Sequence, residues 1–119
     1  GYEYHMDDFS RDEPFMDRSH ARPIVVLPYA LDTNDMKMWN APALMPRDWL
    51  QYLKDSFDCL YAESAARPRM MSVGVHLRII GRPGRIGAFE EFLRYAASVR
   101  GVWIARRSDI AAHYRSAIG

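Results

Sequence analysis

The stretch SVGVHLRIIGRPGR, residues 72–85, decides how the fold of this chain is interpreted. It begins as an apolar, valine-rich run, which predicts a buried strand near residues 71–77. His76 stands at the end of that run, and two arginines follow on either side of a Pro-Gly turn. A histidine in this position is either a core residue with a hydrogen-bond partner or a side chain at the end of an active-site strand.

Two other short runs have the same character, so strands are also expected at 24–29 (IVVLPY) and 102–105 (VWIA). Helical patterns follow each strand. Pro46 suits the first turn of a helix, and Gly84 precedes a second helix. Ser108 is expected to cap a last helix over 109–117. Apolar residues recur at helical spacing at Trp49, Leu50, Leu53, Phe57, Leu60 and Tyr61, and again at Ile86, Phe89, Leu93 and Ala96.

Three successive strand–helix units favour parallel strands joined by right-handed crossovers. The fold class expected is therefore α/β, a partial (β/α) barrel with three parallel strands and intervening helices. Residues 1–22 show no clean period and are expected to form an irregular segment against the three βα units of 23–119. Because parallel sheets need covered faces and paired edges, the chain is expected to dimerise or to pair with further strands.

The charge balance limits the partners. Sixteen basic and fifteen acidic residues leave a net charge of +1, which gives no reason to expect nucleic acid or an anionic membrane as a partner. The single cysteine, Cys59, cannot form an internal disulfide, and its apolar neighbours predict a buried thiol. Without a recognisable signal peptide or an apolar run near 18 residues, a cytoplasmic location is the default expectation.

Polar side chains gather where the predicted strands end, which is where α/β folds place their sites. Each group also has a structural interpretation: the DTND run as a turn and helix cap, the RPGR run as a solvated turn, and the Arg106-Arg107 pair as partners of a nearby carboxylate. The three groups are Tyr29, Asp32, Asn34 and Asp35; His76, Arg78, Arg82 and Arg85; and Arg106, Arg107 and Asp109.

Several chemical motifs are absent from the sequence. It has no phosphate-cradling P-loop, no GxGxxG, no GxSxG and no cysteine pair for zinc. The histidines lack metal-ligand spacings such as HxxxH, so no tight metal site is expected within this chain. The four histidines are His5, His20, His76 and His113.

At these same residues the sequence resembles the polysaccharide deacetylase (NodB-homology) superfamily. Within it, the closer similarity is to a branch that contains cofactor-independent allantoinases and a peptidoglycan deacetylase of a helical pathogen. The resemblance covers nearly the whole chain, and SVGVHLRIIGRPGR followed by RRSDIA is its most specific part. It rests on LPYALDTNDMKMW (27–39), WLQYLKDSFDCLYAE (49–63), RMMSVGVHLRIIGRPGRIGAFEEFLRYA (69–96) and VWIARRSDIAAHY (102–114).

This resemblance implies a distorted (β/α) barrel that hydrolyses amide C–N bonds. The superfamily's aspartate pair and HxxxH metal motif belong to the first half of its domain and have no counterpart here. The chain thus resembles the C-terminal half, and a divalent metal such as zinc is expected only through the missing N-terminal half. His76 matches the histidine that acts as general acid toward the leaving nitrogen.

The hypothesis for function assigns roles on this basis. His76 supplies a proton, and Asp32 or Asp35 orients it or holds a substrate N–H. Arg78 or Arg82 binds a substrate carboxylate or carbonyl, and the further substrate-binding candidates are Tyr29, Asn34, Arg106 and Arg107. A small polar, ureide-like amide is favoured over an N-acetylated sugar, because arginines are plentiful and Trp103 is expected to face packing inside its strand. The alternative is a non-catalytic binding or oligomerisation fragment.

Overall fold

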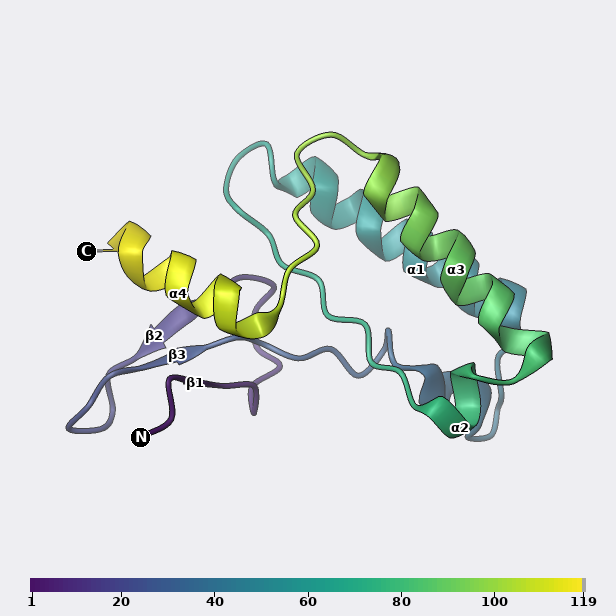
Figure 1. Cartoon of the computed structure of the whole chain (residues 1–119), viewed down its shortest axis with the longest axis horizontal. Coiled ribbons are helices and arrows are strands. Elements are labelled where there is room, and N and C mark those ends of the chain that lie inside the picture. Colours follow the sequence, from purple (N-terminus) through teal and green to yellow (C-terminus); the bar gives the residue numbers. More distant parts are fainter. Residues whose placement is uncertain (119) are drawn as a thin grey trace.

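The computed structural model describes residues 1–118. Residues 1–45 are mostly short strands and irregular chain, and residues 46–118 are mostly helical (Figure 1). The elements in chain order are β1 (Tyr4–His5), β2 (Phe15–Asp17), β3 (Ile24–Val26), the 3-10 helix η1 (Asp35–Met38), α1 (Pro46–Glu63), α2 (Leu77–Ile80), α3 (Pro83–Ser98) and α4 (Arg107–Ile118).

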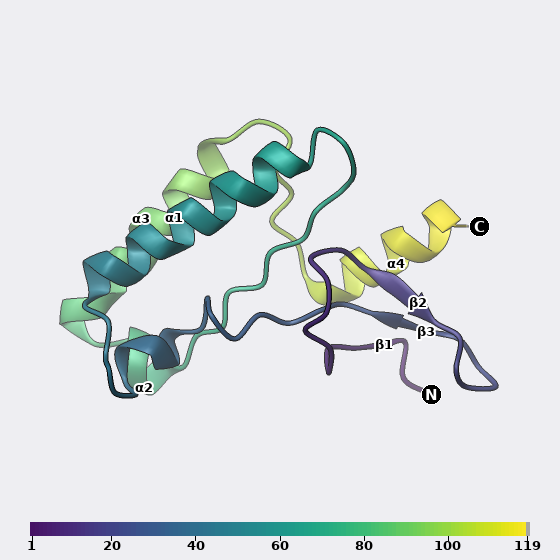
Figure 2. The same ribbon diagram turned by 180° about the vertical axis from the view of Figure 1, so that it is seen from behind.

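The elements form two packed units joined by extended chain, as the views from both sides show (Figures 1 and 2). In one unit, α1 lies beside α3, and η1 and α2 close one end of the pair. Its core is built on Trp49, Leu53, Ile79 and Phe92. In the other unit, α4 packs on β3 through Val25, Leu27 and Ala111.

Helix α1 follows the predicted pattern. It begins at Pro46, which occupies the first helical position, where its missing N–H costs no hydrogen bond. The apolar face from Trp49 to Phe57 is buried, as its spacing predicts. Tyr61, expected on that face, is exposed instead, and its hydroxyl donates to the carbonyl oxygen of Arg100 at 2.9 Å. Cys59 is exposed, so the prediction of a buried thiol was wrong.

Helix α3 also forms where it was expected, but its buried face differs. Phe92 and Ala96 are buried, whereas Ile86 and Leu93 of the predicted stripe are exposed. Helix α4 begins at Arg107, so Ser108 lies inside the helix rather than at its cap. The helix opens instead at Arg106, whose carbonyl oxygen accepts the first backbone hydrogen bonds.

The sheet corrects two expectations. Residues 1–22 are not wholly irregular, because they supply β1 and β2, which pair with the two edges of β3. The strands are not all parallel: β1 runs parallel to β3, and β2 runs antiparallel to it. The strand expected at 24–29 covers only Ile24–Val26, since pairing by β1 and β2 ends there.

The strands expected at 71–77 and 102–105 do not form among the described residues. Both segments lack a regular backbone ladder, and a strand exists only where a neighbour supplies one. Apolar side chains stay in solvent there: Leu77 is 89% exposed and Val75 41%, while Trp103 and Ile104 are 57% and 60% exposed. Trp103 therefore does not face packing, contrary to the sequence-based expectation.

The outline is more extended than that of a closed domain. The Cα radius of gyration is 15.5 Å, against about 13.5 Å expected for a compact chain of this length. The extra length lies in the extended segments between the two units, which Figure 1 shows crossing its centre. No helix in residues 1–118 combines the length and the apolar character needed to cross a bilayer.

Candidate active site

A histidine and a buried carboxylate form the centre of the candidate site. The Nδ1 atom of His76 lies 2.7 Å from Oδ1 of Asp35, and the backbone N–H of His76 donates to the other oxygen, Oδ2, also at 2.7 Å. Asp35 is completely buried, whereas 37% of the His76 side chain is exposed. Because a carboxylate only accepts hydrogen bonds, Nδ1 carries the hydrogen and Nε2 is the ring nitrogen left for a ligand.

The loop after β3 is fastened to the segment before His76 by three hydrogen bonds. The hydroxyl of Thr33 donates to the carbonyl oxygen of Ser72 at 2.5 Å, and the hydroxyl of Ser72 donates to the carbonyl oxygen of Pro28 at 3.1 Å. The backbone N–H of Asp35 donates to the carbonyl oxygen of Gly74 at 2.9 Å. These bonds hold Asp35 in reach of His76 without a regular sheet.

Asn34 takes the helix-capping role considered for the DTND run and also contacts Tyr29. Its Oδ1 accepts from the backbone N–H of Met36 at 2.8 Å, which caps η1, while its Nδ2 donates to the Tyr29 hydroxyl at 2.6 Å. A Cβ at Gly74 would overlap the Tyr29 hydroxyl and lie 2.5 Å from Asn34 Nδ2. Glycine at 74 is therefore required by close packing.

Asp32 lies apart from His76. Its Oδ2 accepts a hydrogen bond from the Tyr52 hydroxyl of α1 at 2.7 Å, on the exposed surface. This hydrogen bond, together with burial and the negative charge of Asp32, raises the pKa of the Tyr52 phenol. Of the two aspartates proposed to orient His76, Asp35 makes the contact and Asp32 ties the loop to α1.

The three arginines after His76 differ in whether their guanidinium groups have partners. Arg78 and Arg82 are exposed, and within residues 1–118 neither makes an ion pair or a side-chain hydrogen bond. Arg85 is half-buried: its Nη1 donates to the carbonyl oxygen of Ile79 at 3.3 Å, and its guanidinium lies 5.8 Å from the centre of the Trp39 ring.

The arginines before α4 belong to the other packed unit. Arg106 holds Asp109 with two hydrogen bonds of 2.9 and 3.1 Å, so it takes the structural role considered for it. These hydrogen bonds and the arginine's charge lower the pKa of Asp109. Arg107 is half-buried at the start of α4, on the unit that packs against β3. The five arginines thus start from two different units and do not form a single group.

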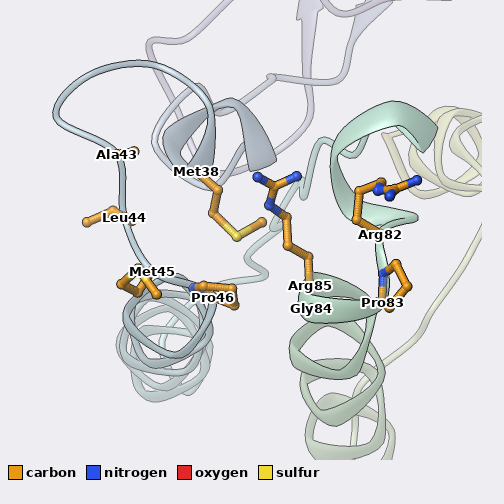
Figure 3. A pocket seen from close by; sticks show the side chains of 9 residues that line it. All are labelled: Met38, Ala43, Leu44, Met45, Pro46, Arg82, Pro83, Gly84 and Arg85. Atoms are coloured by element: carbon orange, nitrogen blue, oxygen red, sulfur yellow. The ribbon is translucent and has the colours of Figure 1, made fainter.

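Neither of two cavities in the described part of the chain includes His76. One, of about 450 Å³, is lined by charged residues of 10–13 and 63–69. The other, of about 460 Å³, lies between η1 and the first turns of α1 and α3. Figure 3 shows Met38 and Arg85 extending into that space, with Arg82 on its far side. The candidate site is therefore identified by its chemistry rather than by a hollow.

No metal-binding group was found in the part of the chain that the structure describes. Within residues 1–118, no three side chains of histidine, cysteine, aspartate or glutamate are grouped so as to hold an ion. The carboxylate of Asp35 is already occupied by two donors from His76.

Thr33, Ser72 and Gly74 escaped the sequence-based list of site residues. Their contribution is to hold two chain segments together, which no local pattern reveals. One indication was present: a glycine inside an apolar run often marks a close approach of another group, and Gly74 is such a residue.

Comparison with known proteins identifies relatives of the chain, although no family model matches it. A Schizosaccharomyces pombe protein named as a polysaccharide deacetylase is 35% identical over 116 residues, which cover 88% of this chain and 36% of that protein. The chain thus spans little more than a third of the length of this curated relative.

Solved structures give a similar result. A probable polysaccharide deacetylase from Pseudomonas aeruginosa PAO1 is 44% identical with a TM-score of 0.93, and the PuuE allantoinase is 43% identical with a TM-score of 0.93. Both matches cover 98% of this chain but only 40% and 39% of the other. A Mycobacterium smegmatis structure, at 21% identity and a TM-score of 0.89, shares the fold.

Proposed function

The chain is a relative of polysaccharide deacetylases and of an allantoinase, and on that premise we propose that it forms the C-terminal half of a hydrolase for non-peptide C–N bonds. In this proposal His76 is the general acid. The observation that carries it is a pair of hydrogen bonds: the buried carboxylate of Asp35 accepts from both Nδ1 and the backbone N–H of His76. Nε2 of the partly exposed ring is thereby left available.

The chemistry of amide hydrolysis explains why such a group is needed. The oxygen of a water molecule adds to the carbonyl carbon, the C–N bond then breaks, and the nitrogen must take up a proton to leave as an amine. Imidazole is a side chain that can exchange protons near neutral pH, and the contact of Asp35 with Nδ1 leaves Nε2 for that exchange. His76 Nε2 delivers the proton, and the proton of the water passes to a base outside this chain.

The water-activating group belongs, in this proposal, to the missing N-terminal half. A divalent metal such as zinc, if the complete protein uses one, is held there as well, since the carboxylate of Asp35 is occupied by His76. The domain boundary follows: residues 1–119 make up the C-terminal half of the catalytic domain.

The proposed substrate is a small polar amide of the ureide type, with an N-acetylated sugar as the second candidate. The unpaired guanidinium groups of Arg78 and Arg82 support the first, because their planar donors suit carbonyl-rich or anionic groups. The exposed rings of Trp39 and Trp103 support the N-acetylated sugar as the second candidate, because indole rings can stack on a pyranose. Tyr29 and Asn34 contribute to substrate binding from the loop after β3.

Turnover assays test the function directly. The chain joined to its N-terminal half should hydrolyse an amide, whereas the chain alone should release no product from allantoin or from a chitin oligosaccharide, with or without zinc. Product release by the isolated chain would contradict the division of labour proposed here. Titration of the complete protein with both compounds separates the substrates, since binding of the oligosaccharide alone would overturn the preference for a ureide.

A binding or association role for the isolated chain is the second candidate. It is favoured by the exposed apolar side chains of residues 71–77 and 102–105, where the expected strands do not form. Each such side chain gains about 1.5–3 kcal/mol on full burial. The isolated chain should therefore self-associate or unfold without a cooperative transition. Sedimentation and thermal melting check this, and a monodisperse, cooperatively melting monomer would count against it.

Substitution of two exposed residues locates that association. Leu77→Asp combined with Ile104→Asp should shift the isolated chain to monomer, because both side chains are largely in solvent and their replacement removes little core packing. Tyr2→Asp is the matched control, since Tyr2 is 92% exposed but lies outside both segments. Equal association of the wild type, the double variant and Tyr2→Asp would show that residues 71–77 and 102–105 are not the contact surface.

A further inference from the structure

We propose, resting on the function above, that the hydroxyl of Tyr29 donates a hydrogen bond to the carbonyl oxygen of the scissile amide. The proposal makes Tyr29 the electrophilic partner of His76: one group polarises the carbonyl and receives its developing negative charge, and the other protonates the nitrogen. It rests on the direction of the Tyr29 hydroxyl proton, on the position of the hydroxyl relative to His76, and on the hydrogen bond that the backbone N–H of Tyr29 already makes to Asp8.

The direction of the proton follows from the fixed amide of Asn34. The backbone N–H of Met36 can only donate, so it must face Oδ1 of Asn34, at 2.8 Å. The Nδ2 group therefore faces Tyr29, and at 2.6 Å the Tyr29 oxygen is the acceptor. The phenol must point its own proton elsewhere, and among the described residues no hydrogen bond donated by the Tyr29 hydroxyl occurs.

The position of the hydroxyl follows from Gly74. The carbonyl of Gly74 and the N–H of His76 both bond to Asp35, as expected of an extended chain in which residues two apart face the same edge. The backbone of His76 is extended, at φ −121° and ψ 129°. Side chains two residues apart in such a chain share one face. The Tyr29 hydroxyl occupies the space of a Cβ at Gly74, so it lies on the His76 face.

The spacing suits a single amide group. Residues two apart in extended chain are separated by about 6.6 Å. An amide places its oxygen and nitrogen about 2.2 Å apart by standard bond lengths and angles, and each hydrogen bond adds about 2.8 Å. The Tyr29 hydroxyl overlaps the Cβ position of Gly74, so its distance from the His76 side chain is of the same order as this span, and the proposal places one amide between the two groups. The backbone N–H of Tyr29 already donates to the carbonyl oxygen of Asp8 at 2.9 Å, which leaves the hydroxyl as the donor of this residue.

Two substrates with different leaving groups test the role of Tyr29 in the complete enzyme. On an amide, Tyr29→Phe should lower kcat by about 10²–10³-fold, as loss of one oxyanion donor does, with little change in KM. On p-nitrophenyl acetate, whose leaving group needs no proton, the same loss should persist, because the oxyanion still forms. His76→Ala should instead lose amide turnover and recover on the ester.

The comparison separates a catalytic donor from a positioning residue. If Tyr29 served only to position Asp35 and His76, Tyr29→Phe would recover on the ester as His76→Ala does, and the inference would be overturned. Unchanged rates on both substrates would overturn it as well. Tyr52→Phe is the matched control, because it removes a phenol bonded to Asp32 of the same loop, and it should remain within threefold of wild type.

The melting temperature separates a loss of catalysis from a loss of folding. The Tyr29 ring packs edge-on against Phe9, with ring centres 6.2 Å apart, and phenylalanine preserves that contact. The melting temperature of Tyr29→Phe should therefore stay close to that of Tyr52→Phe. If His76→Ala kept full amide turnover, the proposed function would fall, while the effect of Tyr29→Phe on the ester would still report on the oxyanion contact.

Discussion

Replacing His76 with alanine in the complete enzyme should lower kcat for amide hydrolysis by about 10²–10⁴-fold, the usual contribution of a positioned general acid. The physical reason is the leaving group: without a proton from Nε2, the departing nitrogen must leave as an anion. KM should change little, because the ring acts mainly in the transition state. Steady-state kinetics on the amide that the enzyme accepts provide the measurement.

Two companion variants sharpen this result. Asp35→Asn retains one acceptor oxygen for the two donors of His76, so the ring loses its fixed tautomer, and a loss of about 10²-fold or more is expected. His113→Ala is the control, because that imidazole is exposed on α4 with its ring 5.6 Å from Trp103. If His76→Ala and His113→Ala had equal, near-normal turnover, the acid role would be wrong.

The second large effect is expected from Gly74→Ala. The added methyl group would overlap the Tyr29 hydroxyl and press on Asn34, and both belong to a loop held by several hydrogen bonds. Overpacking of this kind costs about 1–3 kcal/mol. It should also displace the Asp35 N–H from the Gly74 carbonyl, so activity should fall together with stability. Urea unfolding and kinetics of the same protein measure both.

Gly87→Ala provides the opposite expectation within the same chain. Gly87 lies in α3 with open space where a Cβ would stand, so alanine there should stabilise the protein by about 0.5–1 kcal/mol through better helix propensity. Gly74 has no left-handed backbone that would itself explain a penalty, since among residues 1–118 the glycine with a positive φ is Gly101. Equal unfolding free energies for the two variants would contradict the packing argument at Gly74.

The sequence predicted the local parts of the fold well. Helix α1 was expected because both signals for it, the proline at its start and the apolar spacing of its buried face, lie within one continuous stretch of sequence. The strands at 71–77 and 102–105 were expected from equally good local patterns, yet a ladder depends on a neighbour that a local pattern cannot supply. The pairing of β1 and β2 with β3 was missed for the same reason: it joins residues far apart in the chain.

The candidate site shows the same division. His76 could be singled out because an imidazole after an apolar run is unusual and resembles a family motif. The choice between Asp32 and Asp35 could not be made, since the contact of Asp35 with His76 spans 41 positions. For Arg106, the structural interpretation has a partner in Asp109, one helical turn away, and the substrate-binding role stays a prediction.

The hydrogen bonds that fasten the loop after β3 to the segment before His76 have a consequence for native-state motion. The segments that they join, residues 28–34 and 72–76, contain no helix or strand, and such regions open at a lower free-energy cost than regular packed elements. Amide hydrogens of Asp35 and His76 should therefore exchange with solvent deuterium sooner than those of Leu53 or Phe92. Binding of a strand beside residues 71–76 would slow this exchange, so exchange rates at the site would report on assembly before any catalysis is measured.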